Sequence, residues 1–320
     1  MRHDGGVGYM QYSPLGSTGL TVSKLCFGTL TIGPLQRSFS PSVGGRILAA
    51  ALERGINLVD TAQLYRTYEH IAWALKSTDC EPVVVSKSYA YTAKDMEAAV
   101  LEARQHLGEH IPLVFLLHEQ ESEHTLRGHW PALEYLLQAQ TKGMVQGIGI
   151  STHYIRAVEA AAALPEIQVI SPLINRSGVG IVDGSRDEML AACQTAVAQG
   201  KTLFAMKPLG GGHLMAQRRL ALQYLRDQSW LTSTAVGMKS EQEVAYNVAL
   251  FSGECVDEGF VEFDRVLHVD SWCTGCAACE RACAQQAIRV RQGRAVNDPD
   301  RCVFCGYCGA ACPEFAIKVI

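Results

Sequence analysis

Residues 55–65 read GINLVDTAQLY, and the interpretation of most of the chain starts from this stretch. An apolar run ends at Asp60, and Tyr65 follows five residues later. Continuous apolar runs, unlike alternating ones, are typical of parallel strands that are buried on both faces. We therefore interpret the run as a buried strand that leads into a loop with polar side chains.

Seven further apolar runs lie between residues 25 and 238, and longer stretches with helical spacing separate them. Several helical stretches end at a glycine, as a left-handed C-cap requires: Gly55, Gly108, Gly143 and Gly200. Eight strand–helix units in about 230 residues predict an α/β fold, a closed (β/α)8 TIM barrel. An open doubly wound sheet is less favoured, because no G-x-G-x-x-G turn follows the first strand.

Four ionisable residues stand at or just after the ends of the second, third and fourth predicted strands: Asp60, Tyr65, Lys87 and His118. Active sites of β/α barrels collect side chains from these strand ends. Lys87 is expected to lower the pKa of Tyr65, Asp60 to hold Lys87, and His118 to donate a hydrogen bond to a carbonyl oxygen. Each residue alone has a plain structural explanation, so the combination carries the prediction. The other nine histidines are interpreted as structural or surface residues.

Eight of the twelve cysteines lie in two repeats near the end of the chain. Each repeat has the spacing C-x2-C-x2-C-x3-C; the ligands are Cys273, Cys276, Cys279 and Cys283, then Cys302, Cys305, Cys308 and Cys312. The fourth cysteine of each repeat is expected to complete the site of the other. Paired zinc sites are the alternative, but the third cysteine and the duplicated x3-C fit iron–sulfur cubanes better.

These motifs resemble two known families. Residues 262–320 resemble the bacterial two-4Fe–4S ferredoxin domain, a small α+β ferredoxin-like fold that carries two iron–sulfur clusters. GLTVSKLCFGTLTIG, GINLVDTAQLY and GIGIS, with the four ionisable residues in order, resemble the aldo-keto reductase family over about residues 12–250. The predicted domains are therefore a barrel over 1–261 and a ferredoxin domain over 262–320. The first resemblance implies a one-electron carrier, and the second an NAD(P)H-dependent carbonyl reductase with Tyr65 as general acid.

The aldo-keto reductase resemblance also implies a set of nicotinamide contacts. They are Gly28, Thr29, Ser151, Thr152, Asn175, Met206, Lys207, Pro208, Leu209, Gly237, Lys239, Gln242 and Asn247. The chain departs from the family pattern at several of them: Thr152 replaces an asparagine, and Met206 and Lys207 stand where an aromatic residue commonly stacks on the nicotinamide. Lys239 favours NADP, but Glu243 opposes a phosphate, so the choice between NAD and NADP stays open.

Three functions fit this sequence. The first is a reductase of small carbonyl compounds, or an alcohol dehydrogenase, with an accessory ferredoxin tail. The second is a redox enzyme in which the clusters exchange electrons with the barrel site. A hydride donor carries two electrons and a cluster one, so a flavin would have to mediate, although no flavin motif is present. The third is an electron-transfer adaptor on an inactive barrel, which is disfavoured because the four residues are complete.

The composition of the chain limits the kinds of partner that it is expected to bind. The net charge of −4 gives no indication of nucleic acid binding, and no apolar run is long enough to span a bilayer. With no apolar leader and with cysteines in ligand-like clusters, we expect a cytoplasmic protein. A small-molecule carbonyl or alcohol substrate and a one-electron redox partner protein are the expected partners.

Overall fold

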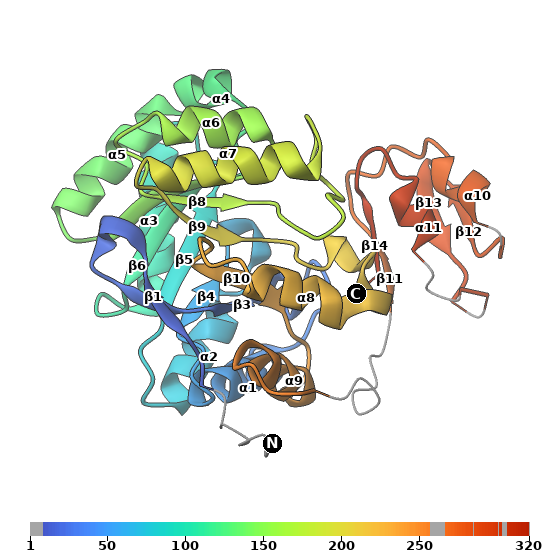
Figure 1. Cartoon of the computed structure of the whole chain (residues 1–320), viewed down its shortest axis with the longest axis horizontal. Coiled ribbons are helices and arrows are strands. Elements are labelled where there is room, and N and C mark those ends of the chain that lie inside the picture. Colours follow the sequence, from blue (N-terminus) through green and yellow to red (C-terminus); the bar gives the residue numbers. More distant parts are fainter. Residues whose placement is uncertain (1–8, 257–265, 284, 300, 303–305, 320) are drawn as a thin grey trace, which may run out of the picture.

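The computed structural model describes residues 9–256, 266–283, 285–299, 301–302 and 306–319. Eight parallel strands close into a barrel, which confirms the predicted fold (Figure 1). In barrel order they are β10 (Ser233–Gly237), β3 (Leu25–Gly28), β4 (Leu58–Asp60), β5 (Val83–Ser88), β6 (Leu113–Leu117), β7 (Gly147–Thr152), β8 (Val169–Pro172) and β9 (Thr202–Ala205). Each strand coincides with one of the eight predicted apolar runs, and β5 and β7 extend one residue beyond theirs.

Helices surround the strands, and the core divides into two layers. An inner cluster fills the barrel with side chains such as Leu58, Val85, Leu116 and Phe204, and an outer cluster packs strands against helices. The helices are α1 (Pro41–Glu53), α2 (Tyr68–Ser77), α3 (Ala93–Leu107), α4 (Glu123–Gly128), α5 (Trp130–Thr141), α6 (Ile155–Ala162), α7 (Arg186–Ala198), α8 (Arg218–Arg226) and α9 (Glu241–Phe251). Because the strands are buried on both faces, their sequences lack polar alternation.

Two features differ from the sequence interpretation. The helical stretch 123–143 is two helices, because Pro131 lies in the first turn of α5 and the chain breaks at His129. An antiparallel hairpin of β1 (Tyr12–Pro14) and β2 (Thr21–Ser23) precedes the barrel. Leu15 and Val22 of this hairpin region join the inner cluster, so the hairpin packs against the barrel interior.

The cysteine-rich tail forms a small α+β domain beside the barrel (Figure 1). Its elements are β11 (Leu267–Val269), α10 (Ala278–Ala282), β12 (Ile288–Arg291), β13 (Arg294–Asn297), α11 (Tyr307–Ala310) and β14 (Ile317–Val319). β11 pairs with β14 and β12 with β13. The predicted boundary at 261/262 and the ligand Cys305 lie outside the described residues. Within the part of the chain that the structure covers, no helix is long and apolar enough to cross a membrane.

β14 lies against the barrel's loop after β9, at the short helix η4 (Gly210–Gly212). A Cβ on Gly212 would overlap the Val319 backbone oxygen, so this close contact requires glycine. The tail therefore packs on the carboxyl-end face of the barrel, where barrel active sites are found.

Candidate active site and cluster sites

The four predicted catalytic residues come together at the carboxyl ends of β4, β5 and β6. The Lys87 Nζ lies 2.7 Å from the Asp60 Oδ1 and donates to the Thr61 backbone oxygen at 2.7 Å. The same ammonium lies 4.9 Å from the centre of the Tyr65 ring. The ring of His118 meets that of Tyr65 edge-on at 5.7 Å. The geometry thus places two charged groups and an imidazole around one phenol.

The electrostatics of Tyr65 differ from the expectation that Lys87 lowers its pKa. Burial raises the Tyr65 pKa well above its usual value, and the negative charge of Asp60 raises it further. Burial is the main physical reason, and the carboxylates of Asp60 and Glu119 add to it. Tyr65 is therefore protonated throughout the physiological range and is available as a proton donor.

His118 is held as a neutral imidazole. Burial and the nearby charges of Lys87 and Lys207 lower its pKa well below the usual value. Its ring stacks on Tyr89 at 4.3 Å, and its Nδ1 is buried without a hydrogen-bond partner among the described residues. A neutral imidazole has one N–H to donate, so His118 is suited to polarise a carbonyl oxygen.

A cavity of about 180 Å³ opens beside these residues, and both domains line it. Asp60 and Tyr65 contribute from the barrel, and Lys318 and Val319 contribute from β14 of the tail. Cavities that enclose a drug-sized ligand measure about 300–1,000 Å³. The enclosed space therefore suits a ring and its reacting group, and a whole dinucleotide would extend beyond it.

The nicotinamide contacts implied by resemblance fall into two groups. Eight line this cavity: Gly28, Met206, Lys207, Pro208, Leu209, Gly237, Lys239 and Asn247. The other five do not line it. Ser151 accepts a bond from the Glu119 backbone, Thr152 from that of Tyr154, and Asn175 binds the backbone of its own loop. Thr29 donates to the Asp60 backbone oxygen, and Gln242 is exposed. The carboxamide side of the expected site is thus occupied by internal hydrogen bonds.

The N-terminus of α9 already has an anion. Glu243 is buried, and its Oε2 accepts a hydrogen bond of 2.9 Å from the Lys239 backbone nitrogen. Burial raises its pKa, although the charges of Lys239, Arg37 and Arg218 oppose this. A phosphate at this helix end would therefore compete with a carboxylate but would also meet several cations.

The tail cysteines surround two separate cavities. Cys273, Cys276 and Cys279 line the first together with Cys312 of the second repeat. Cys302 and Cys308 line the second together with Cys283 of the first repeat. This crossed arrangement is the one expected for two-cluster ferredoxins.

The donor chemistry of these cavities fits iron–sulfur clusters. Backbone N–H groups donate to three of the sulfurs: Ala287 to Cys283, Ala295 to Cys273 and Ala316 to Cys312, at 3.3–3.5 Å. Hydrogen bonds to cysteine sulfur are one of the factors that set cluster potentials. Among the described residues, no three His, Cys, Asp or Glu side chains lie close enough to hold one metal ion. A four-iron cluster is wider than a single ion and separates its ligands further.

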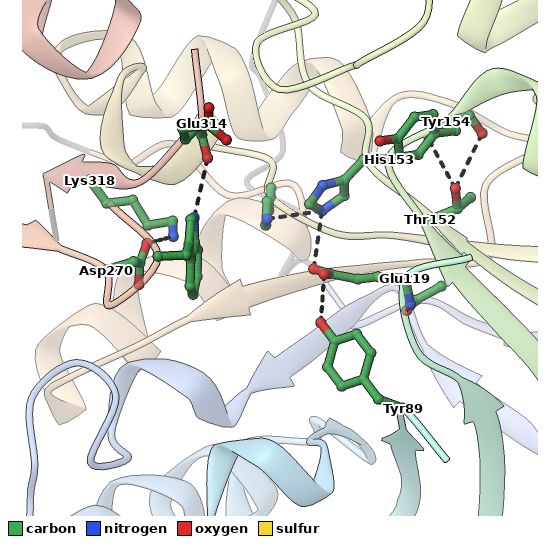
Figure 2. Close-up of polar contacts among 11 residues, drawn as sticks. Tyr89, Glu119, Thr152, His153, Tyr154, Asp270, Glu314 and Lys318 are labelled. Atoms are coloured by element: carbon green, nitrogen blue, oxygen red, sulfur yellow. Dashed lines mark hydrogen bonds and ion pairs between the residues drawn. The ribbon is translucent and has the colours of Figure 1, made fainter. Parts of the chain in front are cut away.

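The sequence interpretation missed three polar residues at this site: Tyr89, Glu119 and His153. The Tyr89 hydroxyl donates to the Glu119 Oε2 at 2.5 Å, and the His153 Nε2 lies 3.7 Å from the Glu119 Oε1 (Figure 2). Glu119 directly follows His118, and His153 directly follows β7. The strand-end rule that selected Asp60 and His118 would also have selected them.

A barrel of this topology with acid–base residues at its carboxyl end, joined to a cysteine-rich α+β domain, defines an iron–sulfur oxidoreductase. The aldo/keto reductase family model matches residues 24–220, and the 4Fe-4S dicluster domain model matches residues 272–316. The chain belongs to the aldo/keto reductase family, and its tail is a 4Fe-4S dicluster domain.

Curated relatives match only in part. The uncharacterized oxidoreductase YrpG of Bacillus subtilis is 33% identical over 95 residues, which cover 30% of this chain and 26% of YrpG. One component of the ion-translocating oxidoreductase complex of Methanosarcina acetivorans is 45% identical over 47 residues, 15% of this chain and 18% of that protein. The chain therefore matches about a quarter or less of either relative's length.

Solved structures share the barrel. A putative aldo-keto reductase from Pseudomonas aeruginosa matches with a TM-score of 0.64 and 24% identity, over 77% of this chain and 97% of that one. A Bombyx mori aldo-keto reductase solved in complex with NADP matches with a TM-score of 0.60 and 17% identity, over 78% and 90%. At these identities the likeness establishes the fold.

Proposed function

We propose that the chain reduces a carbonyl compound, or oxidises the corresponding alcohol, at Tyr65, with NAD(P)H as the hydride carrier. In the reductive direction the hydride adds to the carbonyl carbon, and the Tyr65 hydroxyl gives its proton to the oxygen. Neutral His118 donates a hydrogen bond to the same oxygen. The Asp60–Lys87 pair, buried behind Tyr65, holds these groups in position.

We further propose that two 4Fe–4S clusters in the tail exchange electrons with this site. The observation that supports this is the shared cavity, which Lys318 and Val319 of the tail line together with Asp60 and Tyr65 of the barrel. Cys312 is only six residues before Lys318, and Phe315 between them contacts Lys207. An accessory domain with an unrelated role would have no reason to line the catalytic cavity.

Electron exchange between nicotinamide and the clusters requires a mediator. Nicotinamide exchanges two electrons as hydride, whereas each cluster exchanges one electron at a time. A flavin exchanges electrons in both ways, so a flavin in the same cavity is the mediator that would link the two. Flavin content, measured by absorbance and fluorescence of the supernatant after denaturation, tests this part directly.

Cofactor choice follows from the charges around Glu243. Replacing it by glutamine removes the carboxylate at the start of α9 and keeps its shape, so Glu243→Gln is expected to favour NADPH over NADH. The affinities of wild type and variant for both dinucleotides test this. An unchanged preference would place the 2′-phosphate elsewhere.

An anaerobic titration of the cluster-loaded protein with NADPH and then NADH tests the proposed electron exchange. Bleaching of the visible cluster absorbance is expected. Bound nicotinamide without bleaching would leave a carbonyl reductase whose clusters serve another purpose.

A further inference from the structure

A chain of ionisable side chains connects solvent with the active-site cavity. Glu119 keeps 40% of its side chain exposed, and its Oε1 lies 3.7 Å from the Nε2 of His153. The same Nε2 lies 2.9 Å from the Nζ of Lys207, which lines the cavity with Tyr65. Figure 2 shows the His153 ring close to the Glu119 carboxylate, with a dashed line between them. The contact between His153 and Lys207 has hydrogen-bond length, and the 3.7 Å between His153 and Glu119 must shorten before a proton can pass.

Three residues at or beside this row of side chains have an unfavourable backbone conformation. Glu119, Lys207 and Phe315 have φ values of 50°, 55° and 50°, a left-handed region that non-glycine residues seldom adopt. Phe315 belongs to the tail, and its ring lies 5.1 Å from the Lys207 Nζ. Such conformations are energetically unfavourable and cluster at functional sites. Lys207 and two residues near it share this conformation, which favours a functional role for the position of its ammonium.

The charges around Lys207 adjust its proton affinity. Burial and the charge of Lys318 together lower the pKa of Lys207 to about 8, although the charges of Glu119 and Asp270 oppose this. His153 is neutral because burial and the charge of Lys207 lower its pKa well below the usual value. The charged and titratable groups that face this pair are Glu119 and His118 after β6, Lys87 on β5, and Asp270 and Lys318 of the tail. Lys207 can therefore give and regain a proton near neutral pH, as a general acid must.

We propose that Lys207 is a second proton donor of the active site, which His153 and Glu119 recharge from solvent. This proposal rests on the proposed electron exchange with the tail. Hydride transfer needs one external proton, whereas reduction by single electrons needs two. The carbonyl π bond breaks, two electrons come from the two reduced clusters, and an O–H and a C–H bond form. Tyr65 supplies the proton on oxygen, and Lys207 supplies the proton on carbon. Each cluster is oxidised by one electron.

The first test measures the titration of Lys207 without any turnover. The lysines of the cluster-loaded protein are methylated with ¹³C-formaldehyde, and their NMR signals are followed with pH. We expect Lys207, assigned with Lys207→Arg, to titrate near pH 8. Its pKa should fall in Glu119→Gln and rise in Lys318→Met, because those charges raise and lower it respectively.

Lys24 is the matched control for this experiment. Burial lowers its pKa to about 8 as well, but its ammonium is bound to the backbone of Gln228 and Leu231. It should not respond to either substitution. A Lys207 pKa at the ordinary value of about 10.4, or one that moves no more than that of Lys24, would overturn the proposal.

The second test follows the protons during electron transfer. Clusters of the full chain are reduced anaerobically with dithionite, excess reductant is removed, and benzaldehyde is added as the carbonyl probe. Reoxidation, seen as returning visible absorbance, should slow as pH rises through about 8, because Lys207 then loses its proton. Lys207→Arg keeps the charge but holds its proton, so it should be slower by about 100-fold, with no step near pH 8.

Substitutions along the Glu119–His153–Lys207 chain distinguish proton donation by Lys207 from its later reprotonation. His153→Gln keeps a polar partner for Lys207, so its first turnover should resemble wild type and later turnovers should slow. Wild-type rates and pH profile in Lys207→Arg would overturn the proposal. If wild-type clusters are not reoxidised although Lys207 titrates as expected, electron delivery to carbonyl compounds fails, and the role of Lys207 as second proton donor is overturned with it.

Discussion

The ring of Phe315, three residues after the proposed cluster ligand Cys312, lies 5.1 Å from the Nζ of Lys207, which lines the barrel cavity with Tyr65. This contact joins the two halves of the molecule at the place where chemistry is expected. The Ala316 backbone nitrogen next to it donates to the Cys312 sulfur. Two adjacent residues of the tail, Phe315 and Ala316, therefore connect Cys312 with a residue that lines the cavity.

Tyr65→Phe tests the general acid. The substitution removes the hydroxyl that gives its proton to the substrate oxygen, while the ring continues to fill its place. We expect carbonyl reduction to fall by about 10²–10⁴-fold with nicotinamide binding nearly intact. Steady-state kinetics and fluorescence titration measure the two effects. Turnover that stays at the wild-type level would remove Tyr65 from the acid role.

Cys276→Ala tests the proposed ligand assignment. Cys276 lines the first cysteine cavity, and its loss should release iron from that cavity while the barrel stays folded. Iron analysis and circular dichroism measure both. Cys255→Ala is the matched control, because Cys255 is an exposed cysteine outside the two repeats. Equal iron content in the two variants would contradict the assignment.

The buried ion pair predicts a specific pattern of stability. Asp60→Asn leaves the Lys87 ammonium buried, with 1% of its side chain exposed, and without its counter-charge. The free energy of unfolding should fall by about 3–5 kcal/mol. The double variant Asp60→Asn with Lys87→Met removes the unpaired charge and should recover most of the loss. Denaturant unfolding of the three proteins tests this, and purely additive losses would show that the pair is not coupled.

The buried Lys207 ammonium should lower the free energy of unfolding of the protein. Its folded-state pKa of about 8 is below the ordinary unfolded value, so the unfolded chain binds more protons in between and stability rises with pH from about 8 to about 10.4. Lys207→Met lacks this cost and should be more stable below pH 8 by about 1–3 kcal/mol, a gain that vanishes at high pH. Thermal unfolding at several pH values measures it. A destabilised variant at pH 7 would mean that the ammonium stabilises the fold.

Much of the architecture could be predicted from the sequence, because buried parallel strands produce continuous apolar runs and cluster ligands require fixed cysteine spacing. Asp60, Tyr65, Lys87 and His118 were found by the same logic of strand ends. Glu119 and His153 were missed although both follow strand ends, and Lys207 was predicted as a nicotinamide contact, because no local pattern shows that the three side chains meet. The position in which the tail packs on the barrel could not be predicted from the sequence either. It depends on the contact between Gly212 and Val319 and on the Phe315 ring, which no local pattern marks.

The most direct measurement of the central claim is the anaerobic titration of the cluster-loaded chain with NADPH and then NADH, in the absence of substrate. The account predicts that the visible absorbance of the clusters bleaches, because the clusters and the barrel site exchange electrons through the cavity they share. Nicotinamide that binds without any bleaching, in a protein shown to hold its full complement of iron and any bound flavin, would contradict it.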